Sequence, residues 1–179
     1  IKLPDTVNIM IEEESVVYAI KSSDGQWWMM DSDGRVVEQA NNAKAATATQ
    51  VLGVTLEAPT VNEKGVATEM TPSETNELGE LIPVTTTGAQ RLTAALQILK
   101  ALENNDIVGE AASVDVTSTE DIILWYGTRY QVNLGDTSRL DYKVDCMNDA
   151  ILQMSDYQSG VLDISFTIWP NQVGYTPFA

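Results

Sequence analysis

Ile122 to Leu134, with the sequence IILWYGTRYQVNL, is the stretch that decides the fold of this chain. β-Branched and aromatic residues lie on both sides of Gly127, and these residue types fit the pleated surface of a sheet. Two such runs around a glycine predict a β-hairpin. A helix is predicted to follow, because residues 135–138 break the strand and supply capping side chains just before Arg139.

The predicted helix runs from Arg139 to about Tyr157 and has one apolar face. Five residues at spacings of three and four form that face: Leu140, Val144, Met147, Ile151 and Met154. Residues 161–168 are then predicted as a strand. Pro170 and Asn171 turn the chain into residues 172–176, so the sequence ends on a second hairpin.

The first half of the chain is predicted to be rich in strands. Residues 6–12 alternate apolar and polar, and residues 16–37 form three short strands around the turns Asp24-Gly25 and Asp33-Gly34. Residues 51–56 and 107–117 are two further strand candidates. The remaining segments are assigned as a polar connection at residues 41–50, an exposed, partly mobile acidic loop at residues 57–81, and a helix over residues 87–105.

These elements predict an α+β fold. We expect a curved, largely antiparallel sheet that carries two amphipathic helices on one face. A chain of 179 residues that is 44% hydrophobic is long enough for one well-packed domain.

Composition excludes several classes of function. The net charge of -16, from 26 acidic and 10 basic residues, disfavours binding to nucleic acid or to an anionic membrane surface. The chain has no histidine and a single cysteine, Cys146, so it cannot build histidine-based catalytic pairs or cysteine-rich zinc sites. No phosphate-binding glycine loop is present, and we expect no cofactor, no metal and no enzymatic activity.

Two alternatives remain from the residues themselves, and both belong to a secreted carbohydrate-active or carbohydrate-binding domain. Paired carboxylates could serve a glycoside hydrolase, with Glu12, Glu13, Asp115 and Asp163 as candidates. Aromatic rings could instead form a sugar-stacking platform, for which Trp27, Trp28 and Trp125 are the candidates. Neighbouring strand residues point to opposite faces, which argues against Trp27 and Trp28 acting together.

Four motifs in order give the chain its family resemblance. They are LPDTVNIMIEE at residues 3–13, WMMDSDGRV at 28–36, LG at 134–135 leading into RLDYK at 139–143, and LDISF at 162–166 followed by VGY at 173–175. This series resembles the extracytoplasmic β-domain of the bacterial cell-division proteins called DivIB or FtsQ. The resemblance implies that residues 1–13 are the end of a POTRA-like segment and residues 14–179 the β-domain, with the acidic loop 57–81 as an insertion.

The resemblance also implies a function without catalysis. Members of this family are single-pass membrane proteins whose extracytoplasmic part binds FtsL-like and FtsB/DivIC-like division proteins and helps control septal peptidoglycan synthesis. The sequence starts at Ile1 without a methionine or a signal segment, so we expect a piece of a longer protein whose single N-terminal span lies upstream. An exposed final strand would accept a partner strand by β-augmentation, with Phe166, Val173, Gly174 and Tyr175 as the binding residues.

Overall fold

The computed structural model of the protein describes residues 16–69, 86–167 and 170–179. Within these residues it is a mixed α/β fold in which one nine-stranded sheet carries three α-helices. The elements are β1 (Val17–Ser22), β2 (Trp27–Asp31), β3 (Val36–Ala40), α1 (Asn42–Ala45), β4 (Gln50–Leu56), α2 (Gly88–Asn104), a 3-10 turn η1 (Val108–Glu110), β5 (Ala111–Asp115), β6 (Ile122–Tyr126), β7 (Tyr130–Gly135), α3 (Leu140–Leu152), β8 (Gly160–Asp163) and β9 (Gly174–Pro177).

The strands lie in the order β3-β2-β1-β4-β5-β6-β7-β8-β9. Neighbours pair antiparallel except at β1 with β4, β4 with β5, and β7 with β8, which pair parallel. The prediction of a largely antiparallel sheet is therefore confirmed. Two of the parallel pairs exist because a helix carries the chain back across the sheet, α2 from β4 to β5 and α3 from β7 to β8.

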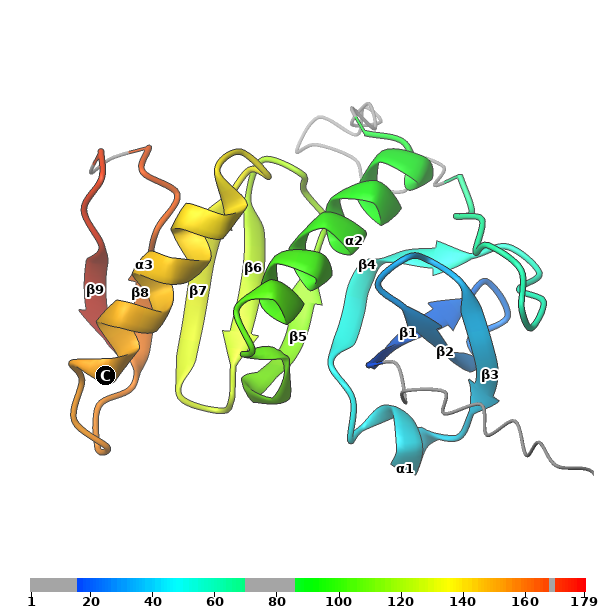
Figure 1. Ribbon diagram of the computed structural model, residues 1–179, viewed down its shortest axis with the longest axis horizontal. Helices are drawn as coiled ribbons and strands as arrows, with labels where there is room; N and C mark the ends of the chain where they lie inside the picture. Colours follow the sequence, from blue (N-terminus) through cyan, green and yellow to red (C-terminus); the bar gives the residue numbers. More distant parts are fainter. Residues whose placement is uncertain (1–15, 70–85, 168–169) are drawn as a thin grey trace, which may run out of the picture.

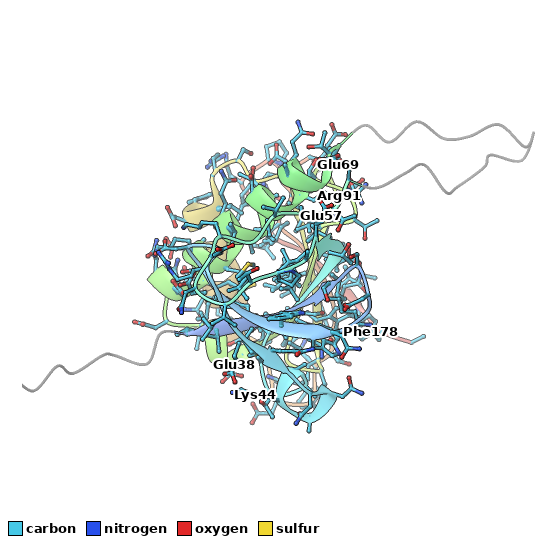
Figure 2. All side chains as sticks on the ribbon, turned by 90° about the vertical axis from the view of Figure 1, so that its right-hand side faces the viewer. Glu38, Lys44, Glu57, Glu69, Arg91 and Phe178 are labelled. Carbon is cyan, nitrogen blue, oxygen red and sulfur yellow. The ribbon has the colours of Figure 1, made fainter. Side chains whose placement is uncertain are left out.

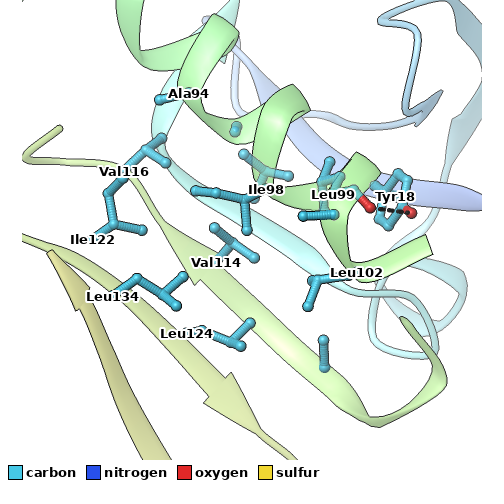
Figure 3. Packing of buried hydrophobic residues seen from close by; sticks show 14 of the residues in the cluster. Tyr18, Ala94, Ile98, Leu99, Leu102, Val114, Val116, Ile122, Leu124 and Leu134 are labelled. Atoms are coloured by element: carbon cyan, nitrogen blue, oxygen red, sulfur yellow. Dashed lines mark hydrogen bonds between the residues drawn. The ribbon is translucent and has the colours of Figure 1, made fainter. Parts of the chain in front are cut away.

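Helices α2 and α3 lie side by side across the same face of the sheet (Figure 1). The core fills the space beneath them, where Ile98 and Leu99 of α2 belong to the same buried cluster as Val114 of β5 and Leu124 of β6 (Figure 3). A fully buried side chain of this size contributes roughly 1.5–3 kcal/mol. The short helix α1 packs Ala45 against a second cluster on the opposite face of β1 and β2.

Local sequence explains the start of α2. The Thr87 hydroxyl accepts the backbone N–H of Gln90, and the Gln90 side chain accepts the backbone N–H of Thr87, which is a complete capping box. The prediction of a helix at residues 87–105 is confirmed. So is the hairpin of β6 and β7 around Gly127, whose φ of 55° is the left-handed conformation that glycine tolerates.

Several predicted boundaries were wrong. Helix α3 ends at Leu152, before Tyr157, and its capping residue Arg139 is left-handed without a side-chain cap. Strand β8 ends at Asp163, before residue 168, because the Asp163 side chain turns back to accept the backbone N–H of Ser165. The connection at residues 41–50 contains α1, which Asn41 caps through its side chain.

The acidic loop lies only partly within the described residues. The first part of this loop packs against the sheet: Leu56 and Ala67 form an antiparallel β-bridge, and the Ala67 side chain is buried. The Thr68 backbone N–H donates to the Thr55 carbonyl at 2.8 Å. The predicted strand at residues 6–12 and the remainder of the loop lie outside the residues described.

One lysine ties α3 to the sheet. Lys143 is 1% exposed, and its ammonium donates to the Leu134 carbonyl, the Asp136 carbonyl and the Asp136 carboxylate, each at 2.8 Å. A buried charge is tolerated only when it is paired and hydrogen-bonded in this way. The hydrogen bond from Lys143 is the main reason that the pKa of Asp136 falls to about 2.

Replacing Lys143 with methionine is expected to lower the free energy of unfolding by about 2–3 kcal/mol, because hydrogen bonds from a charged group are lost. Urea denaturation measures the change. Lys44→Met is the control, since Lys44 forms a half-exposed ion pair with Glu38 and its loss is expected to cost less than about 1 kcal/mol. Equal losses in the two variants would contradict this role of Lys143.

The Asp136 carboxyl should also make the free energy of unfolding depend on pH in the acidic range. Its pKa is lower in the folded chain than in the unfolded chain, so its contribution is complete above about pH 4 and is lost as the pH falls through about 2. Asp136→Asn is therefore expected to reduce the loss of stability between pH 6 and pH 2, measured by urea unfolding. The same substitution in a Lys143→Met background should have little effect on that loss.

Candidate partner-binding edge

Strand β9 forms one edge of the sheet, at the left end in Figure 1. No segment among residues 16–69, 86–167 and 170–179 pairs with its outer side. The opposite edge, β3, is partly covered: the Val36 N–H donates to the Glu63 carbonyl at 2.9 Å, and the Val36 carbonyl accepts the Asn62 N–H at 2.7 Å. Glu38 and Lys44 add an ion pair beside it (Figure 2). Charges and covering loops block pairing at a sheet edge, so β9 is the more open of the two.

The hydrogen-bond pattern shows which groups of β9 point outward. The Phe178 N–H donates to the Ser159 carbonyl at 3.1 Å, so this opposed pair is hydrogen-bonded. Bonded and non-bonded pairs alternate along an antiparallel ladder, which directs the Gly174 and Thr176 backbone toward β8 and the Tyr175 and Pro177 backbone outward. Tyr175 therefore offers an N–H and a carbonyl on the open side, whereas Pro177 offers only its carbonyl.

Gly160 is what allows β9 to lie so close to β8. A Cβ at this position would lie 2.3 Å from the Thr176 carbonyl oxygen and 2.8 Å from the Tyr175 ring. The Tyr175 ring therefore covers Gly160, and its hydroxyl donates to the Ser159 carbonyl at 3.1 Å. Any side chain at residue 160 would force β9 away from the sheet.

A groove runs between α3 and β9 on the helix-covered face. Its volume is about 470 Å³, and its lining residues come from α3, from the chain that follows it, and from β9 and the residue before it: Cys146, Asp149, Ala150, Gln153, Met154, Gln158, Val173 and Tyr175. A chain that paired with β9 would place every second side chain above this groove.

The structure brings only some of the predicted binding residues together. Val173 and Tyr175 line the α3–β9 groove, and Gly174 lies between them. Phe166 lies beyond the end of β8 and does not line that groove. Its ring is 5.6 Å from that of Tyr142, a residue of α3 that sequence reasoning did not select.

The sheet also contains a repeat that the sequence analysis missed. Strand β4, α2, β5 and β6 form a β-α-β-β unit, and β7, α3, β8 and β9 form a second one beside it. In both, the first strand pairs parallel with the second, and the second pairs antiparallel with the third. Strand β9 thus corresponds to β6.

The two units match residue by residue at one turn. The backbone N–H of Thr117 donates to the Asp115 side chain at 2.8 Å, and that of Ser165 donates to Asp163 at 3.0 Å. The intervening residues Val116 and Ile164 are both fully buried. The short pattern Asp-Val-Thr and Asp-Ile-Ser was the available sequence signal for this repeat.

The repeat shows what covers the edge in the first unit. In the matched register Leu124 of β6 corresponds to Tyr175 of β9. Strand β7 pairs antiparallel along β6 and places the buried Val132 opposite Leu124. The equivalent place beside β9 is empty of any segment from the described part of the chain.

The candidate carboxylates do not form a catalytic pair. Asp115 and Asp163 lie in one row across β5, β6, β7 and β8, three strand spacings apart, which is about 14 Å. Glycoside hydrolases need a separation of roughly 5–10 Å. Both side chains also accept backbone N–H groups in their turns. Glu12 and Glu13 lie outside the described residues.

The three tryptophans do not form one platform. Trp28 packs against the main core, whereas Trp27 packs against the cluster on the other face, as strand alternation predicts. Trp125 stacks on Phe178, with ring centroids 6.2 Å apart. Among the residues that the structure describes, no three acidic, cysteine or histidine side chains are grouped to hold a metal ion. None of the described helices is both long and apolar enough for a membrane span.

Gly160→Ala is expected to release β9, because the added Cβ would overlap the Thr176 carbonyl. Hydrogen exchange followed by NMR should show faster exchange at the Gly174 and Thr176 amides and unchanged exchange in β6. Gly109→Ala is the control, because a Cβ there meets open space. Full protection of β9 in Gly160→Ala would contradict the close packing.

The chain was compared with family models, curated proteins and solved structures. No family model, no curated protein and no solved structure matches it. Membership of the DivIB/FtsQ family therefore stays a prediction from the sequence motifs.

Proposed function

We propose that this chain is the non-enzymatic extracytoplasmic domain of a bacterial cell-division scaffold of the DivIB/FtsQ type. It binds FtsL-like and FtsB/DivIC-like membrane proteins by β-augmentation at β9 and helps control septal peptidoglycan synthesis. The proposal includes a curved sheet with two amphipathic helices, a POTRA-like segment ending at residue 13, and a single N-terminal membrane span that places this domain outside the cytoplasm.

The observation that carries the proposal is the outer side of β9, with which none of the described segments pairs. Unpaired backbone groups at a sheet edge are a template for another strand, and most folds cover or interrupt them. Here the Tyr175 N–H and carbonyl point outward, while the corresponding groups of β6 are used by β7. This supports a partner strand that runs antiparallel to β9, as β7 runs to β6.

The α3–β9 groove supports the same partner. Backbone pairing gives affinity without much selectivity, so selectivity has to come from side-chain pockets. A partner residue opposite Tyr175 would take the place that Val132 holds opposite Leu124, which favours an apolar residue there. The polar part of the groove lining comes from an acidic and two amide side chains, Asp149, Gln153 and Gln158.

Substitutions along β9 test the edge directly. Tyr175→Ala should weaken binding of the FtsB/DivIC-like extracytoplasmic segment, because it removes a ring that lines the groove. Tyr175→Pro should weaken binding by a further fivefold to tenfold, because it also removes the outward N–H and with it about one hydrogen bond to the partner. Pro177→Val should strengthen binding by a similar factor, because it adds an outward N–H. Isothermal titration calorimetry measures all three affinities.

Thr176→Val is the matched control, since the Thr176 backbone bonds to β8 and its side chain lies on the face away from the groove. Its affinity should equal that of the unmodified chain. Gly174→Pro should weaken binding too, but by breaking the pairing of β8 with β9. Unchanged affinity in both Tyr175→Pro and Pro177→Val would refute pairing at this edge.

A further inference from the structure

Arg139 lies exposed just before α3, next to two aromatic rings that also contact each other. Its guanidinium carbon is 4.4 Å from the centre of the Tyr142 ring and 5.6 Å from that of Phe166. Its Nη1 donates to the Asn171 side chain at 3.1 Å. Aromatic faces hold a planar guanidinium by stacking and cation–π attraction, so this side chain is oriented before any ligand arrives.

Arg139, Tyr142, Phe166 and Asn171 form what we call the Arg139 cluster. Three of its residues have a positive backbone φ angle. Arg139, Phe166 and Asn171 have φ values of 54°, 59° and 56°. They are half of the six residues other than glycine with positive φ in the described part of the chain. Asparagine tolerates this conformation, but for arginine and phenylalanine it costs on the order of 1–2 kcal/mol each. Strain held at one contact between two loops points to a function for that contact.

The charge of Arg139 is not neutralised within the cluster. Lys44, Lys100 and Lys143 each form an ion pair, but no carboxylate of the described residues lies within ion-pair distance of Arg139. This is notable in a chain with a net charge of -16. An oriented arginine fork with free donors is suited to bind a carboxylate.

The position of the cluster relates it to the β9 edge. Phe166 and Asn171 belong to the connection between β8 and β9, so the cluster lies at the end where β9 begins. A strand antiparallel to β9 would reach this end with its C-terminal residues. Strand β7, which fills the equivalent place beside β6, is followed immediately by an acidic residue, Asp136.

We propose that Arg139 binds the carboxylate of an acidic residue that follows the partner's added strand. This inference rests on the proposed function and adds the chemistry of the partner: an apolar residue opposite Tyr175 and a glutamate or aspartate just beyond the strand. Tyr142 and Phe166 are positioning residues, because they hold the guanidinium by stacking.

Three fluorescein-labelled peptides of about ten residues, the upper end of usual strand lengths, serve as probes. Each alternates valine and threonine and has an amidated C-terminus. One carries a glutamate at its C-terminal end, the second carries it at its N-terminal end, and the third carries glutamine at the C-terminal end. Fluorescence anisotropy measures their affinities at two salt concentrations, because an exposed ion pair weakens in salt.

The peptide with C-terminal glutamate is expected to bind about fivefold tighter than the other two. Arg139→Gln should remove this preference, Arg139→Lys should keep part of it, and Phe166→Leu should reduce it. Arg129→Gln is the matched control, since Arg129 also lies over a tyrosine ring, at 5.1 Å from Tyr130, but bonds to the Asp156 carbonyl. It should leave the preference unchanged.

The outcomes separate this inference from the proposed function. If Tyr175→Pro weakens binding of all three peptides while Arg139→Gln keeps the glutamate preference, the edge site stands and carboxylate recognition is refuted. If Arg139→Gln weakens all three equally, Arg139 only fastens the loop to α3. If the peptide with N-terminal glutamate binds as tightly as the one with C-terminal glutamate, the antiparallel direction is refuted. Absence of binding by every peptide would contradict both.

Discussion

A lysine ammonium buried beneath α3 holds the first turn of that helix against the end of β7. The position of α3 determines much of what lies at the outer end of the molecule. The helix covers the buried residues of β7 and β8, forms one wall of the α3–β9 groove, and carries Tyr142 to the Arg139 cluster. Because Lys143 bonds to two main-chain carbonyls as well as to a carboxylate, it fixes the backbone and not only a neighbouring side chain.

The sheet is long because one β-α-β-β unit lies beside another. The third strand of the first unit, β6, pairs with the first strand of the second unit, β7. The third strand of the second unit, β9, has no such neighbour within the described residues. The same aspartate turn follows the middle strand of each unit. The outer side of β6, which pairs with β7, and the outer side of β9 thus have the same backbone geometry, and the pairing of β6 with β7 shows what kind of strand fits β9.

Local patterns predicted the elements that depend on local sequence. The runs on either side of Gly127 gave β6 and β7, the stripe of α2 gave its helix, and the turn at Pro170 and Asn171 gave the final hairpin. The left-handed Arg139 was not predictable, because its conformation depends on Phe166 and Asn171, which lie far along the chain. The need for glycine at residue 160 likewise arises from β9, a long-range contact.

The candidate site was likewise predicted only in part: three of the four residues lie together at β9, and Phe166 lies elsewhere. Val173, Gly174 and Tyr175 are neighbours in sequence, and the family resemblance implied that their strand forms a sheet edge, which is the position of β9 in the sheet order. Phe166 was assigned to the same pocket because it was expected on the neighbouring strand, across the final hairpin, but the aspartate turn after β8 carries it toward α3. Periodicity cannot report such a turn, since it describes residues only while a strand continues.

The proline at the outer side of β9 also bears on solubility. An open strand edge can recruit a second copy of its own chain and then grow into a fibre, which is a hazard at high concentration. Pro177 withholds a donor where such growth would need one, so a ladder built on this edge stays short. Because it withholds this donor, Pro177 is placed as a gatekeeper against self-assembly.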